Sequence, residues 1–264
     1  MTSPGTGALA GRHAVVTGGS RGLGATIAEA LAARGASVSI LGRDRQALEA
    51  QVAVLRRHQP RAEAISCDVG DPDQISRAFA EAVSRLGPVE ILVNNAGQGD
   101  ARPFGDVTLA VWNQMLAVNL TGAFLCTQHV LPAMIAAGFG RVVNIASTAG
   151  LKGYTLTTPY CASKHGLVGL TRALAVETAK SGVTINAVCP GYVDDTDMLR
   201  AAVSQVMRTK GENEADARKR LARASPRGWL ITRDEVADAV AWLCSPGASA
   251  ITGQAIAVAA GEVM

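Results

Sequence analysis

Three polar residues in one stretch of the chain have the spacing of a proton-transfer site. Tyr160 and Lys164 stand four residues apart, so a helix would carry them on one face, one turn apart. Pro159 precedes them, as is typical of a helix's first turn. Ser147 follows the apolar run 141–146, which has the pattern of a buried strand. Because an ammonium group lowers the pKa of a neighbouring phenol, the stretch predicts a proton donor or acceptor for an alcohol–ketone pair.

The segments that must position this site alternate between short apolar runs and longer helical patterns. We expect strands at 13–17, 37–41, 62–67, 89–94, 141–146, 183–188 and 255–258. Strands that alternate with helices form parallel βαβ units with right-handed crossovers. No shift in composition divides the chain. The sequence therefore predicts an α/β fold with one domain over residues 1–264, a Rossmann-like doubly wound parallel sheet flanked by helices on both faces.

A glycine-rich turn, residues 17–24, follows the first expected strand and opens the first expected helix. Gly18, Gly22 and Gly24 would let the backbone turn sharply and approach a pyrophosphate. The free N–H groups at the helix start would then bind the negative charge. The spacing differs from the common Gly-x-Gly-x-x-Gly, but the strand–turn–helix context is the one that a dinucleotide site requires. We therefore expect a dinucleotide cofactor.

The end of the second strand indicates which dinucleotide is used. An acidic residue there would bind the adenosine ribose of NAD, but Gly42 and Arg43 occupy the place. A guanidinium suits a 2′-phosphate, which a carboxylate would repel. Arg21 in the glycine-rich turn adds a second positive charge. The sequence thus favours NADP(H) over NAD(H), although a purely surface role for Arg43 stays open.

Composition argues against several other classes of protein. With 25 basic and 22 acidic residues, the formal charge of +3 is too balanced to indicate a nucleic-acid or anionic-membrane partner. Five cysteines show no CxxC pair and no metal-ligand spacing, so we expect no metal and a reducing compartment. We find neither a secretion signal nor a run of about 18 apolar residues. We therefore expect a cytoplasmic protein with no membrane span.

Taken together, these motifs resemble the short-chain dehydrogenase/reductase family. The resemblance spans residues 12 to 261 and depends on several motifs in the right order. They are the turn 17–24, Asp68-Val69, Asn94-Asn95-Ala96-Gly97, Asn119, Ser147, the run from Tyr160 to Lys164, and Pro190-Gly191. Each motif alone is weakly specific, whereas their joint order is highly specific.

The resemblance implies a role for each matching position. Ser147 would hold the substrate oxygen, Tyr160 would exchange a proton with it, and Lys164 would bind the nicotinamide ribose and lower the Tyr160 pKa. Asn119 would interrupt its helix and fix a water that connects Lys164 to solvent. The implied cofactor-binding residues are Gly18, Ser20, Arg21, Gly22, Leu23, Gly24, Arg43, Asp68, Val69, Asn95, Ala96, Gly97, Tyr160, Lys164, Pro190, Gly191, Val193 and Thr196.

Two positions depart from the family pattern. The family usually has a threonine five residues after the proline of Pro190-Gly191, where this chain has Asp195 followed by Thr196. The threonine's role near the nicotinamide is therefore shifted by one residue or lost. The usual glycine pair near the C-terminus is Ala260-Gly261 here, which affects a turn and not the chemistry.

The resemblance leaves the substrate open. It implies a substrate lid at about 192–227. Within the family, the sequence is similar to 3-oxoacyl thioester reductases and polyketide ketoreductases. Bacterial fatty-acid 3-oxoacyl reductases typically present arginines at places that match Gly138 and Val176 here, and an acidic carrier protein needs such positive charge. We therefore favour a free ketone, a cyclic or aromatic ketone, or a CoA thioester, with a carrier-bound substrate as the alternative.

Two further expectations concern assembly and activity. The family resemblance implies a homotetramer that pairs the long helices around 109–137 and 160–180. Small residues such as Gly166 and Gly169 would allow close packing there, although packing within one subunit explains them nearly as well. A competing hypothesis is a catalytically silent dinucleotide-binding regulator, which has no physical need for Asn119, Ser147, Tyr160 and Lys164 together.

Overall fold

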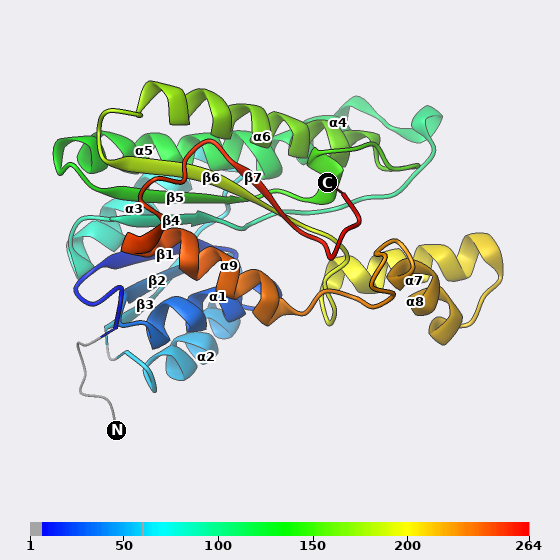
Figure 1. Cartoon of the computed structure of the whole chain (residues 1–264), viewed down its shortest axis with the longest axis horizontal. Helices are drawn as coiled ribbons and strands as arrows, with labels where there is room; N and C mark the ends of the chain where they lie inside the picture. The colour runs from blue at the N-terminus through cyan, green and yellow to red at the C-terminus, as the bar shows by residue number, and fades with distance from the viewer. Residues whose placement is uncertain (1–6, 60, 264) are drawn as a thin grey trace.

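A parallel seven-stranded sheet runs through the centre of the computed structural model, which describes residues 7–59 and 61–263. The spatial order of its strands is β3-β2-β1-β4-β5-β6-β7 (Figure 1). The strands are β1 His13–Thr17, β2 Ser37–Gly42, β3 Ala62–Ser66, β4 Ile91–Asn94, β5 Gly140–Ile145, β6 Val183–Pro190 and β7 Ala255–Val258. Residues 1–6 and 264, the ends of the predicted 1–264 domain, lie outside the described part.

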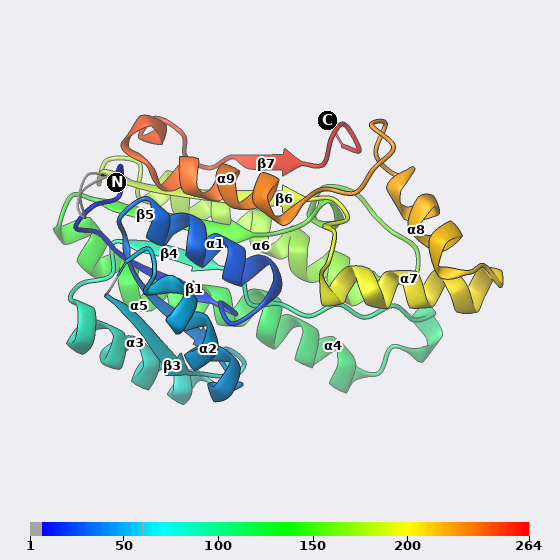
Figure 2. The same ribbon diagram turned by 90° about the horizontal axis from the view of Figure 1, so that it is seen from below.

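Helices cover both faces of the sheet. They are α1 Gly22–Ala33, α2 Arg45–Leu55, α3 Pro72–Leu86, α4 Leu109–Leu116, α5 Gly122–Ala136, α6 Thr158–Glu177, α7 Asp197–Lys210, α8 Glu214–Ala222 and α9 Arg233–Cys244. In Figures 1 and 2, α1, α2 and α9 lie on one face, and α3, α5 and α6 on the other. The predicted α/β fold class, a doubly wound Rossmann-like sheet, is confirmed.

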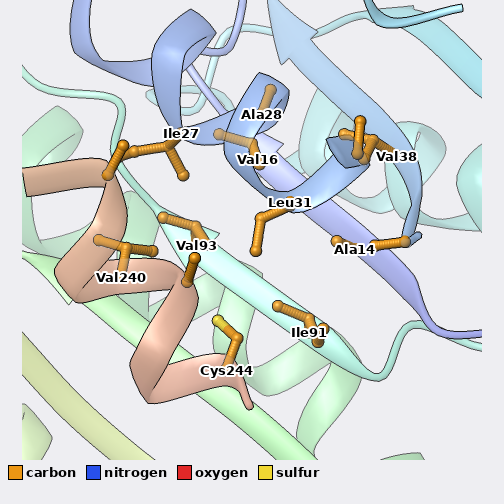
Figure 3. Packing of buried hydrophobic residues seen from close by; sticks show 14 of the residues in the cluster. Ala14, Val16, Ile27, Ala28, Leu31, Val38, Ile91, Val93, Val240 and Cys244 are labelled. Atoms are coloured by element: carbon orange, nitrogen blue, oxygen red, sulfur yellow. The ribbon is translucent and has the colours of Figure 1, made fainter. Parts of the chain in front are cut away.

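The core is built from aliphatic side chains between the sheet and each helical layer. On one face, Ile27 and Leu31 of α1 pack against apolar side chains of β1 and β4, next to Val240 of α9 (Figure 3). Ile27, Leu31 and Val240 are fully buried. Because both faces of the sheet are covered, its central strands are continuous apolar runs and do not alternate with polar residues. That burial holds the strand ends, and thus the site, in fixed positions.

The order of the strands determines where a ligand can bind. β1 pairs with β2 on one side and with β4 on the other. Successive strands are therefore added outward in one direction from β1 to β3, and in the opposite direction from β4 to β7. Crevices at such switch points, at the carboxyl ends of the strands, are the usual ligand sites of open α/β sheets. The glycine-rich turn after β1 and the segments after β4, β5 and β6 all meet at that edge.

The polar segment 196–227 forms two helices, α7 and α8, which project beyond the end of the sheet (Figure 2). They pack on each other around a small apolar cluster that contains Leu199, Val203, Ala217 and Leu221.

The predicted strands match the observed ones to within two residues. The long helical region is interrupted, because a π-helical turn at Ala117–Thr121 separates α4 from α5.

The helical region Leu109–Ala136, made of α4, the π-helical turn and α5, bears on the prediction that the chain has no membrane span. It is long and apolar enough to cross a bilayer, judged by length and composition alone. One such helix is weak evidence, because the core helix of a folded domain meets the same criteria. Here α5 packs against α3 and β5, with Cys126, Val130 and Met134 buried in the core.

Candidate active site

The expected proton-transfer residues meet where β5 ends and α6 begins. Ser147 lies just beyond β5, and its Oγ accepts a hydrogen bond from Ala149 N at 3.1 Å, which caps the 3-10 turn Thr148–Gly150. Tyr160 and Lys164 lie on the first turns of α6, which has Pro159 in its opening turn. Ser147 lies near enough to the Tyr160 hydroxyl to lower its pKa. The three side chains that the sequence predicted to converge therefore do so.

The protonation of Tyr160 differs from the sequence expectation. We expected the Lys164 ammonium to lower the Tyr160 pKa, whereas burial raises it to about 12, partly offset by the hydrogen bond to Ser147. Lys164 Nζ donates to the carbonyl oxygen of Ile145 at 2.7 Å and lies 5.7 Å from the centroid of the Tyr160 ring. Burial lowers the Lys164 pKa to about 8. Near pH 7 the phenol therefore keeps its proton, and most of the ammonium stays charged.

Asn119 lies in the π-helical turn, so it does interrupt its helix as predicted. Its buried side chain fixes the segment after β4: Oδ1 accepts from Gln98 N at 2.9 Å, and Nδ2 donates to Gln98 O at 2.9 Å. Nδ2 also donates to Ser163 Oγ on α6 at 3.1 Å. A Cβ placed on Gly97 would lie 3.4 Å from Asn119 Oδ1 and 3.6 Å from Lys164 Nζ. Asn119 thus joins the β4 segment to the helix that carries Tyr160.

The glycine-rich turn has the geometry that a bound dinucleotide needs. Gly18 and Gly22 adopt positive φ angles of 64° and 54°, which favour glycine. Gly24 has no room for a side chain, since a Cβ would lie 2.2 Å from Gly18 O. Asn95 Nδ2 donates to Thr17 O at 2.9 Å and so joins the turn to β4. α1 then begins at Gly22, which places its free N–H groups beside the turn.

Two arginines lie at the edge of this crevice. Arg43 follows β2 with 73% of its side chain exposed, and its Nη1 lies 3.8 Å from Asp68 Oδ2. Arg21 is equally exposed at 73%, and its Nε lies 3.3 Å from Asp197 Oδ2 at the start of α7. Neither guanidinium is used in the core, so both are accessible to an anionic group. This arrangement fits the 2′-phosphate of NADP(H).

The remaining predicted cofactor residues lie along the same edge of the sheet. Asp68 and Val69 follow β3, and Asp68 Oδ1 accepts from Gly70 N at 2.9 Å. Ala96 N donates to Thr17 Oγ1 at 3.0 Å, which holds the end of β4 against the end of β1. The structure therefore brings the predicted positions from β1, β3 and β4 to one crevice. Ser20 and Leu23 lie within the turn itself.

In the segment after β6, Thr196 forms the N-cap of α7. Pro190 ends β6, and Val193 forms an isolated bridge with Ile231. Asp195 has a φ of 53°, and the chain then enters α7 with Thr196 as its N-cap. Thr196 Oγ1 accepts from Leu199 N at 3.2 Å and donates to Val193 O at 2.9 Å. The hydroxyl of Thr196 is therefore used for capping in this structure.

Three residues that the sequence analysis did not single out also line the site. Met198 of α7 lies over the Tyr160 phenol, with Sδ 3.5 Å from the hydroxyl. Tyr154 donates a hydrogen bond to Glu262, which comes from the far end of the chain. A lone carboxylate in the apolar tail 255–263 was the only signal for Glu262. Among the described residues, no cluster of three or more metal-ligating side chains occurs.

Comparison with known proteins assigns the family. Residues 12–206 match the family model described as short chain dehydrogenase. The chain is 40% identical over 263 residues to a protein of Streptomyces violaceoruber named as a ketoacyl reductase of the granaticin polyketide synthase, covering 98% of this chain and 95% of that protein. It is 37% identical over 255 residues to cis-4-hydroxycyclohexanecarboxylate dehydrogenase of Sinomonas cyclohexanicum, covering 96% and 97%.

A solved structure shows the same fold. A variant of actinorhodin polyketide ketoreductase, crystallised with NADPH, superimposes with a TM-score of 0.91 at 38% identity and covers 95% of this chain and 97% of that one. The family model extends over most of the chain, and the relatives extend over nearly all of it. The chain therefore belongs to the short-chain dehydrogenase/reductase family of oxidoreductases.

Proposed function

We propose that this enzyme interconverts a ketone and a secondary alcohol with NADP(H), with Tyr160 as the general acid and base. The observation that carries the proposal is the convergence of Ser147, Tyr160 and Lys164 beside the glycine-rich crevice. The NADPH complex of a relative at 38% identity supports the choice of cofactor. Sequence relatives named as ketoacyl reductase and as hydroxycyclohexanecarboxylate dehydrogenase support the ketone–alcohol chemistry.

The chain's own residues account for the proton half of the reaction. Ser147 and Tyr160 would both donate hydrogen bonds to the substrate oxygen, which stabilises the negative charge that develops during reduction. The raised pKa of Tyr160, about 12, keeps the phenol protonated near neutral pH and therefore suits it to protonate the alkoxide. When bound, the nicotinamide supplies or accepts the hydride. Asn119 would hold the water through which the proton is replaced.

The cofactor would lie along the crevice between β1 and β4. The turn 17–24 would hold the pyrophosphate, Arg21 and Arg43 the 2′-phosphate, and Asp68 with Val69 the adenine. The Asn95–Gly97 segment would contact the ribose side, and Lys164 would bind the nicotinamide ribose. The remaining contacts, at the nicotinamide, would come from Pro190, Gly191, Val193 and Thr196.

The substrate that we favour is a free ketone, a cyclic or aromatic ketone, or a CoA thioester. Residues 192–227 would form the lid, because α7 places Met198 against Tyr160. Gly138 and the 79%-exposed Val176 offer no positive charge for an acidic carrier protein. A carrier-bound polyketide is the second candidate, favoured by the relatives that are named for polyketide ketoreduction.

Cytoplasmic location and a homotetramer complete the proposal. Exposed apolar residues on the outer faces of the long helices, Phe124 and Ile135 of α5 and Val176 of α6, support helix pairing between subunits. A Cβ on Gly166 would lie 2.8 Å from Leu120 Cδ2, so that glycine serves packing within the subunit. Gly169 has open space around it and is free for an interface.

A reductase assay tests this proposal. We would follow NADPH consumption with cyclic ketones, a 3-oxoacyl-CoA, and the same acyl group on a carrier protein. We expect turnover with a free or CoA-linked ketone. Turnover with the carrier-bound substrate alone would support the second candidate. Tight NADPH binding without turnover of any ketone would instead favour a silent regulator.

A further inference from the structure

The C-terminal tail brings a carboxylate back to the site. After β7, Ala260 and Gly261 adopt positive φ angles of 48° and 88°, which turn the chain inward. Ser225 Oγ donates to Ala260 O at 3.2 Å and anchors this turn to the segment after α8. The next residue is Glu262, whose side chain is only 2% exposed. A carboxylate this deeply buried needs polar partners, because burial of an uncompensated charge is costly.

Glu262 finds its partners in the loop between Ser147 and Tyr160. The Tyr154 hydroxyl donates to Glu262 Oε1. Lys152 Nζ lies 3.4 Å from the same oxygen, donates to the main-chain oxygen of Glu262 at 3.3 Å, and lies 5.0 Å from the Tyr154 ring centroid. Burial and the hydrogen bond to Glu262 both raise the Tyr154 pKa. The phenol therefore keeps its proton and holds the contact.

The contact extends to the residue beside Ser147. The oxygens of Tyr154 and Thr148 lie 2.7 Å apart. Because the Tyr154 proton goes to the carboxylate, the buried Thr148 hydroxyl donates to Tyr154. Thr148 opens the 3-10 turn that Ser147 caps. The hydrogen-bonded chain from Glu262 through Tyr154 to Thr148 thus ends one residue from Ser147.

The second oxygen of the carboxylate lies against another part of the site. Oε2 would be 2.8 Å from a Cβ placed on Gly191, so a side chain at position 191 would displace the Glu262 carboxylate. Gly191 follows β6 in the segment that we place beside the nicotinamide. One carboxylate therefore bonds to the loop after β5 and lies beside the segment after β6.

We propose that Glu262 is a positioning residue, which acts through Tyr154 to hold the Ser147 turn in the geometry for carbonyl reduction. This inference relies on the proposed function. Removal of the carboxylate would leave Tyr154 without its acceptor and Thr148 without a fixed partner. Small displacements of a catalytic group lower the rate of the chemical step more than they lower binding. Glu262 lies beside Gly191, at the nicotinamide end of the cofactor site. The turn 17–24, Arg43 and Asp68, which we place at the pyrophosphate, the 2′-phosphate and the adenine, follow other strands, so most of the NADPH affinity should be retained.

The test compares Glu262→Ala, Glu262→Gln, Tyr154→Phe and the double variant Glu262→Ala/Tyr154→Phe. Glu49→Ala is the control, since Glu49 is an exposed carboxylate on α2 that pairs with Arg45. For each variant we would measure kcat for a ketone, the NADPH dissociation constant by fluorescence, and the ultraviolet titration of the tyrosines. The chain has three tyrosines, so Tyr154→Phe assigns the Tyr154 transition.

We expect Glu262→Ala to lower kcat about tenfold or more while the NADPH dissociation constant changes less than about twofold. Glu262→Gln keeps an acceptor oxygen and should recover most of the rate. The double variant should lose no more than either single variant, because both act through one contact. In Glu262→Ala the Tyr154 transition should shift to lower pH.

Two results would overturn the proposal: wild-type kcat in Glu262→Ala, or losses that multiply in the double variant. The first of these results, together with a lower stability of the Glu262→Ala variant, would mean that Glu262 has a structural role only. A wild-type protein that binds NADPH but reduces no ketone would refute the proposed function. In that case an unshifted tyrosine titration in Glu262→Ala would separately refute the Glu262–Tyr154 contact.

Discussion

The choice of cofactor is most sharply tested at Arg43. We predict that Arg43→Ala weakens NADPH binding by a factor of about two to twelve and leaves NADH binding unchanged. A hydrogen bond to a charged group contributes about 1.5–3 kcal/mol, and the 73% exposure of this side chain places it at the lower end of that range. Separation from Asp68, 3.8 Å away and partly exposed, costs less than about 1 kcal/mol. The net loss is then about 0.5–1.5 kcal/mol, which is a factor of about two to twelve.

The assay is a titration of NADPH and NADH by intrinsic fluorescence or calorimetry, at low and moderate salt. Arg45→Ala is the matched control, because Arg45 is 81% exposed, lies two residues away and pairs with Glu49 on α2. The difference between Arg43→Ala and wild type should shrink with added salt, since exposed charges are screened. The double variant Arg21→Ala/Arg43→Ala should bind NADPH more weakly than Arg43→Ala by a further factor of similar size, since independent contacts add in free energy.

An unchanged ratio of NADPH to NADH affinity in Arg43→Ala would refute the assignment of this arginine to the 2′-phosphate. Equal losses of affinity for both cofactors would give that result, because NADH has no 2′-phosphate. A tenfold loss in the Arg45→Ala control would show that general surface charge, and not Arg43, attracts the cofactor.

Three further predictions concern the site and the core. Met198→Ala removes the thioether over the Tyr160 hydroxyl and should raise kcat/KM for bulky ketones relative to small ones by a few-fold; an unchanged ratio in a substrate series would contradict this. Lys164 has a pKa of about 8 in the folded protein, below its unfolded value, so its charged form destabilises the folded state. This loss of stability is complete below pH 8 and is relieved as the pH rises toward about 10.4. Denaturation across that range should show a rise in stability that Lys164→Met lacks. Asn144→Ala leaves the buried amide of Asn94 without its 2.9 Å acceptor and should cost about 1–3 kcal/mol in urea unfolding; a loss under about 0.5 kcal/mol would argue against it.

The parts of the fold that follow from local patterns were predictable. Continuous apolar runs mark the buried parallel strands, and the turn 17–24 marks the strand–helix junction. The approach of Ser147 to Tyr160 follows from a strand end and a helix start separated by a short loop. Asn119 was expected to interrupt its helix, and the π-helical turn confirms this.

The parts that depend on tertiary contacts were not predictable. The raised pKa of Tyr160 results from burial, and the spacing of Tyr160 and Lys164 indicates nothing about burial. Glu262 and Tyr154 are 108 residues apart, so no local pattern joins them. The position of Met198 depends on how the chain turns at Asp195, just before α7. Asp195 has a left-handed backbone conformation, which the sequence motifs do not specify.

The most direct test of the proposed reaction is to follow deuteride from C4-labelled NADPH to a ketone in wild type and in Tyr160→Phe. Wild type should form alcohol with deuterium on the carbinol carbon. Tyr160→Phe, which keeps the ring but loses the proton, should bind NADPH as tightly as wild type and turn over about 10²–10⁴-fold more slowly. Deuterated alcohol formed at the wild-type rate by Tyr160→Phe would contradict the role of Tyr160 as the general acid.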